Sequence, residues 1–169
     1  TTPIHRNVPD SRGSNAYRMD PEFGRLLPVY LPSELRPTVE PQLDRLGALV
    51  GSELEELALT ADRNPPVLRP RARNGEDTHS VEKHPAYRRL EQYAFSQFGL
   101  AAMSHRSGVF GASQPLPPIV KYALTYLFVQ AEFGLCCPLS MTDALTRTLR
   151  KFGSKELIER YFDALTTQD

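Results

Sequence analysis

The sequence predicts an all-α fold that carries one small β-hairpin. Apolar residues recur at steps of three and four along most of the 169-residue chain, which is typical of amphipathic helices. The prolines gather where these periodic segments begin or end. A single Asn-Gly pair lies between two short, weakly apolar runs, as in a β-hairpin. The length suits one domain with a sizeable core.

The composition indicates a globular protein and excludes several classes. Hydrophobic residues make up 40% of the chain and the mean hydropathy is −0.39. Twenty basic residues balance twenty acidic ones, so nothing in the net charge favours nucleic acid or an anionic membrane. No apolar run is long enough for a membrane span, and the N-terminus lacks a signal-peptide core. Two cysteines do not form a disulfide framework, so we expect a reducing compartment, the cytoplasm or an organellar matrix.

The first third of the chain predicts an arm and two helical regions. Residues 1–18 are polar and aperiodic, and we expect an extended arm there. Asp20 and Pro21 are typical of a helix start, and Pro32 of its end. Apolar residues at helical spacing then continue to residue 63, and Gly51-Ser52 with two prolines predicts that this region is divided into pieces. The apolar positions are Phe23, Leu26, Leu27, Tyr30, Leu35, Val39, Leu43, Leu46, Val50, Leu54 and Leu57.

The hairpin is predicted near residues 67–81, with a two-residue turn at Asn74-Gly75, since both residues can take a positive φ. Pro70 interrupts one arm, so the ribbon should be short. A second strong helix is expected over residues 84–105. Its inward side chains would be Tyr87, Leu90, Tyr93, Ala94 and Phe98.

The last third predicts a central, largely buried helix that starts at the proline pair and runs through residues 119–136. Pro138 would restart the chain as another helix, which Gly153 ends. A final helix follows Ser154. The helical domain would thus cover residues 19–165, and residues 166–169 would begin a linker.

Residues with reactive side chains give few independent signals. Cys136 and Cys137 lack partners at metal-ligand spacing, so we interpret them as buried structural thiols at the end of the central helix and predict no metal site. Glu132 is expected to pair with a basic group of another helix. His84 before Pro85 is expected to cap a helix. His105 belongs to a basic run that closes a helix at Gly108.

The order of short motifs carries a resemblance. The motifs are Asn64-Pro65-Pro66, Gly75, Val81, His84-Pro85, Arg106-Ser107-Gly108, Gln130, Glu132, Gly134, Cys137-Pro138 and Ser140-Met141-Thr142. In this order and spacing the chain resembles the N-terminal α-helical domain of AidB-like acyl-CoA dehydrogenases, which are FAD flavoproteins. The resemblance spans residues 15–145.

The resemblance implies an enzyme of which this chain is one part. In that family, proton removal at Cα accompanies hydride transfer from Cβ of the acyl-CoA to the flavin. The flavin-contacting run Met-Thr-Glu-x-x-x-Gly-Ser-Asp and the catalytic glutamate of the C-terminal bundle have no match here, so no catalytic residue is expected in this chain. The resemblance further implies a β-domain, a C-terminal bundle, a homotetramer and a place in fatty acid metabolism.

Position by position, the resemblance assigns the floor of the acyl pocket to the helix after Pro138. The implied pocket residues are Ser140, Met141, Asp143, Ala144 and Arg147, and the residues nearest the flavin are Met141 and Thr142. Asp143 and Arg147 lie one helical turn apart and could pair. If both face the pocket, a short or polar acyl group is favoured over a long plain chain. Both side chains could equally face solvent or another subunit.

The sequence is compatible with two other functions. The alkylation-response relative suggests a DNA-associated flavoprotein, although the neutral charge of this chain does not favour contact with DNA through it. A helical interaction module that has lost the flavin is the other alternative.

Overall fold

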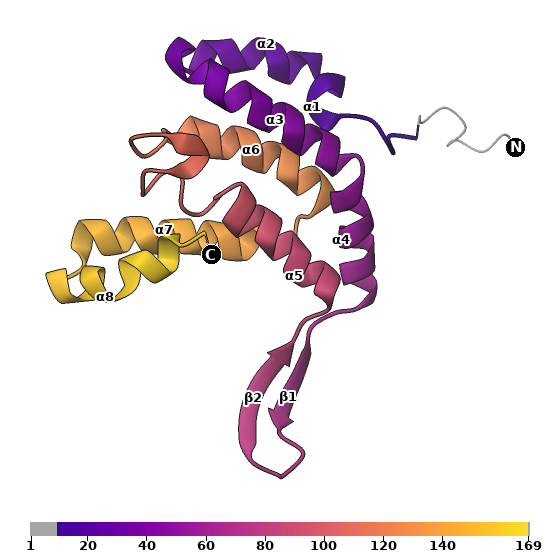
Figure 1. The fold of residues 1–169 in the computed structure, drawn as a ribbon, viewed down its shortest axis with the longest axis vertical. Helices are drawn as coiled ribbons and strands as arrows, with labels where there is room; N and C mark the ends of the chain where they lie inside the picture. Colours follow the sequence, from indigo (N-terminus) through magenta and orange to yellow (C-terminus); the bar gives the residue numbers. More distant parts are fainter. Residues whose placement is uncertain (1–9, 169) are drawn as a thin grey trace, which may run out of the picture.

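The computed structural model describes residues 10–168, which form eight α-helices and one two-stranded antiparallel sheet (Figure 1). The predicted all-α fold with one hairpin is confirmed. Helices α3, α6, α5 and α7 follow one another down the molecule in Figure 1, and α4 runs along one side. None of the described helices is long and apolar enough to cross a membrane.

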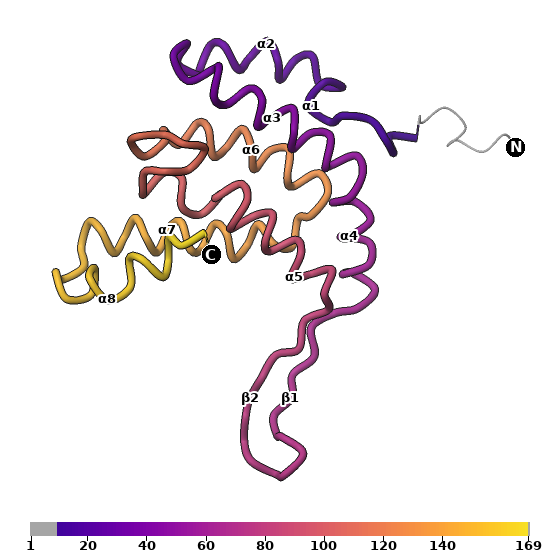
Figure 2. Tube along the Cα trace, viewed as in Figure 1, coloured from indigo at the N-terminus to yellow at the C-terminus, as the bar shows by residue number. Residues whose placement is uncertain are grey.

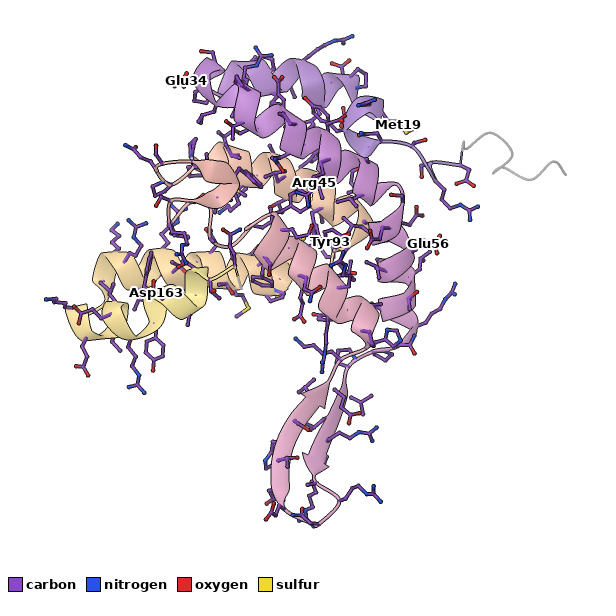
Figure 3. All side chains as sticks on the ribbon, in the orientation of Figure 1. Met19, Glu34, Arg45, Glu56, Tyr93 and Asp163 are labelled. Atoms are coloured by element: carbon purple, nitrogen blue, oxygen red, sulfur yellow. The ribbon has the colours of Figure 1, made fainter. Side chains whose placement is uncertain are left out.

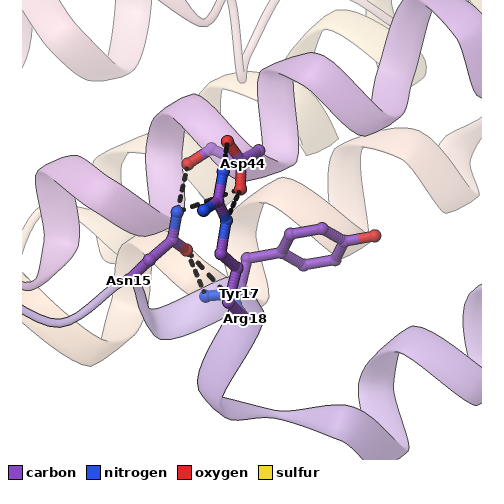
Figure 4. Close-up of polar contacts among 4 residues, drawn as sticks. All are labelled: Asn15, Tyr17, Arg18 and Asp44. Carbon is purple, nitrogen blue, oxygen red and sulfur yellow. Dashed lines mark hydrogen bonds and ion pairs between the residues drawn. The ribbon is translucent and has the colours of Figure 1, made fainter.

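The N-terminal segment is held against helix α3. Residues 1–9 of the predicted extended arm lie outside the described residues, and the end of that arm is helical instead, as α1 (Ala16–Met19). Asn15 caps α1 and its Nδ2 also donates to the carboxylate of Asp44 on α3 (Figure 4). Arg18 Nε donates to the same carboxylate at 2.6 Å. The carboxylate of Asp44 therefore binds both Asn15, before α1, and Arg18, within α1, and so holds this short helix against α3.

Helix α2 (Pro21–Tyr30) begins as predicted. The Asp20 carboxylate accepts from the backbone N–H of Phe23 at 2.8 Å and from the Tyr126 hydroxyl at 2.6 Å. Of the predicted apolar face, Leu27 is buried, but Leu26 and Tyr30 are exposed because only one side of α2 contacts the body.

The next region is divided at Gly51, as expected. A short 3₁₀ turn, η1 (Ser33–Leu35), leads into α3 (Arg36–Val50) and then α4 (Glu53–Arg63). The backbone N–H of Gly13 donates to the Gly51 carbonyl at 2.7 Å. A Cβ at Gly51 would overlap the Ser14 carbonyl oxygen, so the arm can cross here only over glycine.

The hairpin projects from the helices between α4 and α5 (Figures 1 and 2). Strand β1 (Val67–Arg71) pairs with β2 (Asp77–Glu82), and all the residues of both strands are exposed. The register shifts opposite Pro70, where His79 takes a φ of 45°. The predicted two-residue turn is wrong: residues 72–76 connect the strands, and only Gly75 in this connection has a positive φ.

The second predicted helix is shorter than expected. Helix α5 (Pro85–Glu91) passes into a π-helical segment, η2 (Gln92–Gln97), and the chain then continues in turns. Gly99 takes a φ of 55°, which ends helical geometry before the predicted boundary at residue 105. The inward positions predicted for this helix are confirmed: Leu90, Tyr93, Ala94 and Phe98 are buried, and Tyr87 packs against the core. Figure 3 shows Tyr93 between the helices.

A short 3₁₀ turn, η3 (Val109–Gly111), precedes α6 (Pro118–Ala131). Helix α6 packs against α3 and contributes to the core, whereas Tyr122 and Tyr126 are exposed on its other side. The helix ends at Ala131, before the predicted boundary. Helix α7 (Cys136–Phe152) follows, and it pairs with α8 (Lys155–Thr166). Gly153 ends α7 and the Ser154 hydroxyl caps α8, both as predicted.

Candidate functional site

The most polar buried group of the domain is centred on the carboxylate of Asp143. Its Oδ1 lies 2.8 Å from His105 Nε2, and its Oδ2 accepts from Lys121 Nζ at 2.6 Å. The His105 side chain is 3% exposed and that of Lys121 8% exposed. The contact joins α7, α6 and the turns after η2, which are distant in the sequence.

The periodicity of α7 explains why Asp143 points inward. Leu139, Asp143 and Thr146 follow at steps of four and three and are all buried, so they form the inner row of this helix. Lys121 occupies the corresponding inner side of α6, next to Val120 and Leu124. Burying an ammonium group there is tolerable only because a carboxylate meets it.

Burial and charge act in opposite directions on these groups. Burial disfavours the ionised Asp143, but hydrogen bonds from Lys121 and His105 outweigh it and hold the pKa of Asp143 below its ordinary value. Burial also lowers the pKa of His105, against the opposing effect of Asp143. At neutral pH the group is therefore an ammonium–carboxylate pair beside a neutral imidazole that donates from Nε2.

The predicted pocket residues divide into two sets. Ser140, Met141 and Ala144 are exposed on the outer row of α7, and Leu145 is exposed beside them. Asp143 lies on the inner row, and its carboxylate pairs with Lys121 and His105 rather than with Arg147. Thr142, one of the two residues predicted nearest the flavin, is partly buried, whereas Met141 is 67% exposed.

A basic cleft of about 260 Å³ lies beside the buried group. His105 and Arg147 are among its walls, so the structure brings this predicted residue close to the Asp143 group without pairing the two. The lining residues are Ser104, His105, Pro118, Arg147, Arg150 and Lys151. Within residues 10–168, no carboxylate lines this cleft.

A larger cleft of about 920 Å³ has the opposite charge. It lies between the N-terminal segment, α4 and the turn that joins α6 to α7, and it includes several of the motif residues: Pro65, Pro66, Gln130, Glu132 and Gly134. Its carboxylates are those of Asp20, Glu55, Asp62 and Glu132, and no lysine or arginine of the described part of the chain lines it. The charge of this cleft therefore does not suit an anionic group.

Two local predictions need correction. Cys136 and Cys137 do not end the central helix but begin α7, where Cys137 is exposed and Cys136 only half-buried, because α6 stops earlier. Glu132 forms no ion pair among the described residues; its carboxylate accepts from the backbone N–H of Leu135 at 3.0 Å and so shapes the turn before α7. His84 caps α5 as predicted, accepting from the N–H of Ala86.

The buried Lys121–Asp143–His105 group was not predicted, although one signal existed. Lys121 is the only charged residue between Pro118 and Ala131. It lies three residues before Leu124 and seven before Phe128, on the side of the helix that carries apolar core residues. A lysine in that place implies a buried acidic partner, but the partner's position in the sequence cannot be read from the pattern.

The comparisons with known proteins decide the family. Residues 7–169 match the family described as adaptive response protein AidB N-terminal domain. The chain belongs to this family. The resemblance in the short motifs is thereby confirmed.

Two known proteins are similar to this chain over most of its length. An acyl-CoA dehydrogenase family member 11 from Caenorhabditis elegans is 24% identical over 158 residues, which cover 92% of this chain and 25% of that protein. A solved structure titled "Bd2924 apo-form" shares the fold, with a TM-score of 0.81 and 24% identity over 94% of this chain and 30% of the other. The AidB N-terminal domain described here thus spans about a quarter to a third of the length of the relatives that it matches.

Proposed function

We propose that this chain is the N-terminal part of an FAD-dependent acyl-CoA dehydrogenase that oxidises an acyl-CoA to the 2,3-enoyl-CoA. Its own task is to wall the acyl pocket. The observation that carries the proposal is the outer row of α7, where Ser140, Met141 and Ala144 lie side by side and remain uncovered in this chain. These are three of the residues that the resemblance assigns to the pocket floor.

The chemistry of this row suits the acyl part of a thioester. Met141 and Leu145 offer exposed apolar surface, and Ala144 leaves room beside them. Apolar pocket walls with few polar groups are typical of small-molecule sites. Because Asp143 points inward, one of the two charges that favoured a short or polar substrate is absent from this surface.

The inner row then has a positioning role. The pair between Asp143 and Lys121 fixes the rotation of α7 about its axis, and this rotation decides which side chains the outer row presents. The domain thereby orients a wall and excludes water, while proton removal belongs to residues of the enzyme outside this chain.

The residues present fit FAD only as an outer contact. Met141 has an exposed thioether that can lie against a flavin ring, but the described residues enclose no cavity lined like a dinucleotide site. FAD, when bound, supplies the hydride acceptor for the oxidation. We propose that most of its contacts come from the β-domain and the C-terminal bundle, in a homotetramer in the cytoplasm or an organellar matrix.

The proposal is tested on the purified full-length protein. A flavin absorbance spectrum and anaerobic bleaching by a series of acyl-CoA thioesters establish the reaction and the acyl preference. We expect Ala144→Trp to weaken the bleaching by longer acyl groups at least tenfold while the flavin content is unchanged. Ala164→Trp, at an exposed alanine of α8, is the matched control and should have no effect. A colourless protein, or one that no acyl-CoA bleaches, contradicts the proposal.

The resemblance to an alkylation-response protein suggests one second candidate, a DNA-associated flavoprotein, and the matching family is described as an adaptive response protein. The net charge of zero gives this chain no means of attracting DNA over a large surface. Duplex binding by the full-length protein that weakens steeply with salt would support this candidate. Such binding would have to come mainly from other parts of the protein.

A further inference from the structure

We propose that an apolar groove between α2 and α6 is the surface on which a second copy of this chain packs, about a two-fold axis. The inference rests on the proposed function in one respect, since it assigns a surface to the oligomer proposed there. It involves neither the outer row of α7 nor the reaction.

The groove has a volume of about 370 Å³ and lies between two rows of apolar side chains. Its walls include Phe23, Leu26 and Tyr30 on α2 and Ile119, Tyr122 and Tyr126 on α6. Each row advances by three and then four residues, which is the spacing of one helix face. The Tyr126 hydroxyl donates to Asp20 at 2.6 Å, and the Tyr126 and Phe23 ring centroids are 4.8 Å apart. Contacts within the domain therefore hold the two walls together.

Large apolar residues at this groove are uncovered. Leu26, Tyr30, Tyr122 and Tyr126, together with Val29 beside Leu26, are between 46% and 71% exposed. Side chains of this size and exposure leave about 500 Å² of mostly apolar surface in water. The largest such patch on a typical monomer is about 300–600 Å², and each partner of a stable complex buries about 800 Å². The patch is therefore large enough to be the centre of a dimer interface.

The composition of the groove is typical of such a centre. Tyrosines are enriched in interface cores, whereas charged side chains are depleted there. Among the described residues, no lysine or arginine lines the groove, and its two carboxylates, Asp20 and Glu22, lie at one end. Asp20 is already occupied by the Phe23 backbone N–H and the Tyr126 hydroxyl. The centre of the groove thus offers a partner only apolar surface and phenol hydroxyls.

The exposed row of α2 is complementary to itself. Glu22, Leu26 and Tyr30 follow at steps of four, so they share one side of the helix. When two copies of α2 pack antiparallel with the axis at Leu26, Glu22 of each copy lies opposite Tyr30 of the other, and the phenol can donate to the carboxylate. Glu22 also pairs with Arg25, so its approach leaves no uncompensated charge. A two-fold interface requires this kind of self-complementary surface.

The position of α2 favours a second copy over the rest of the same enzyme. Helices α2 and α7 lie at opposite ends of the row of helices in Figure 1. Under the proposed function the other domains pack against the outer row of α7. The surface of α2 is therefore left for another molecule, and the proposed homo-oligomer supplies one with the same surface.

The test is sedimentation velocity of the purified full-length protein over a range of concentrations. Leu26→Glu places two carboxylates at the axis, so it should weaken this contact at least tenfold and halve the mass of the oligomer. Leu26→Arg should have the same effect. Because the two substituted residues meet across the axis, mixing the two variants should restore the wild-type mass. Contact with any other surface would not give this restoration.

The controls separate loss of the contact from loss of the fold. Leu26 is more than half exposed, so both variants should keep the wild-type circular dichroism spectrum. Tyr122→Glu, on the other wall of the groove, is an independent second variant and should also lower the mass. Leu68→Glu, at a similarly exposed leucine of the hairpin, should leave the mass unchanged.

A wild-type protein that is monomeric at all concentrations overturns the inference, as does an unchanged mass in Leu26→Glu and Tyr122→Glu. Lower flavin content at unchanged mass would also overturn it, by showing that another part of the enzyme covers the groove. Anaerobic bleaching by acyl-CoA is recorded on the same samples. A colourless oligomer that these substitutions dissociate contradicts only the proposed reaction, and a bleached protein of unchanged mass contradicts only the interface.

Discussion

Lys121 Nζ donates to Asp143 Oδ2 at 2.6 Å and thereby joins α6 to α7 inside the domain. Further polar contacts connect the α7–α8 pair to the other helices and turns of the domain. Arg106 donates to the carbonyl of Thr166, and the Gln168 side chain donates to the carbonyl of Ser96. The position of the outer row of α7 therefore depends on a small number of charged and polar groups.

Asp143→Asn should lower the free energy of unfolding by about 3 kcal/mol, because it leaves the buried ammonium of Lys121 without a counter-charge. Adding Lys121→Met should recover at least half of this loss, since the new amide oxygen can still accept from His105. Urea unfolding of the four proteins of this cycle measures the coupling. Glu40→Gln, in the half-exposed pair with Arg36 on one helix, is the control and should cost less than about 1 kcal/mol. Additive effects of the two substitutions would contradict the coupling.

His105 predicts a loss of stability on mild acidification. Its folded pKa is depressed by burial below the ordinary value of 6.5, so the unfolded chain takes up its proton first as the pH falls. The free energy of unfolding should thus decrease from about pH 6.5 downward, until the folded protein is also protonated. Asp143, Arg147 and Arg150 are the charged groups that act on this imidazole.

The measurement is urea unfolding between about pH 7.5 and 5.5, a range that brackets the ordinary histidine pKa. His105→Gln keeps a donor for Asp143 but does not titrate, so its stability should change less over this range. Parallel pH profiles for the two proteins would show that another group is responsible. The depressed pKa of Asp143 adds a second loss at lower pH, below its ordinary value of 3.8.

Gly51→Ala should displace the N-terminal segment from α3. The added Cβ overlaps the Ser14 carbonyl oxygen, which belongs to the backbone and cannot rotate away. We expect a loss of about 1–3 kcal/mol and faster tryptic cleavage after Arg12, which is exposed. Gly24→Ala is the matched control: nothing lies within 4 Å of its Cβ, so it should stabilise α2 by up to about 1 kcal/mol. Equal cleavage of both variants would contradict this account.

The hairpin should be dispensable for the helical core. All the side chains of its two strands are exposed, and Val67 lies opposite Glu82. Opposed residues of an antiparallel pair are about 5 Å apart, so a four-residue Gly-Ser linker can join Pro66 to Lys83. We expect cooperative unfolding to persist, with a change of less than about 1 kcal/mol. A broad or greatly shifted transition would show that the ribbon supports the helices after all.

Local patterns predicted the helices whose ends are marked by side chains. The predicted helix caps are all present, at Asp20 before Pro21, His84 before Pro85, and Ser154. Such caps can be predicted because each hydrogen bond joins residues no more than three positions apart. The predicted length of the turn at Asn74-Gly75 was wrong, because this dipeptide fits turns of more than one length. The register shift at Pro70 decides which of these lengths the hairpin has. The predicted end of α6 was wrong because Glu132 takes part in a turn after the helix, and the periodicity of apolar residues does not reveal this turn.

The site was predicted only in part for a similar reason. The resemblance predicted that α7 carries the pocket residues, but it did not predict which residues of that helix point outward. That division depends on Lys121 and His105, whose contacts span 22 and 38 residues along the chain. Similarly, the basic cleft combines α7 with Ser104, from a stretch where a helix was expected and turns were found.

The two rows of α7 are open to different kinds of evolutionary change. Leu139, Asp143 and Thr146 face the interior, so a replacement there must satisfy the folding of the whole domain. The side chains of Ser140, Met141 and Ala144 are exposed and take no part in the core. Under the proposed pocket role, a lineage can acquire a new substrate by changing the outward residues alone, and divergence among descendants should concentrate at those three positions while the inward row stays constant.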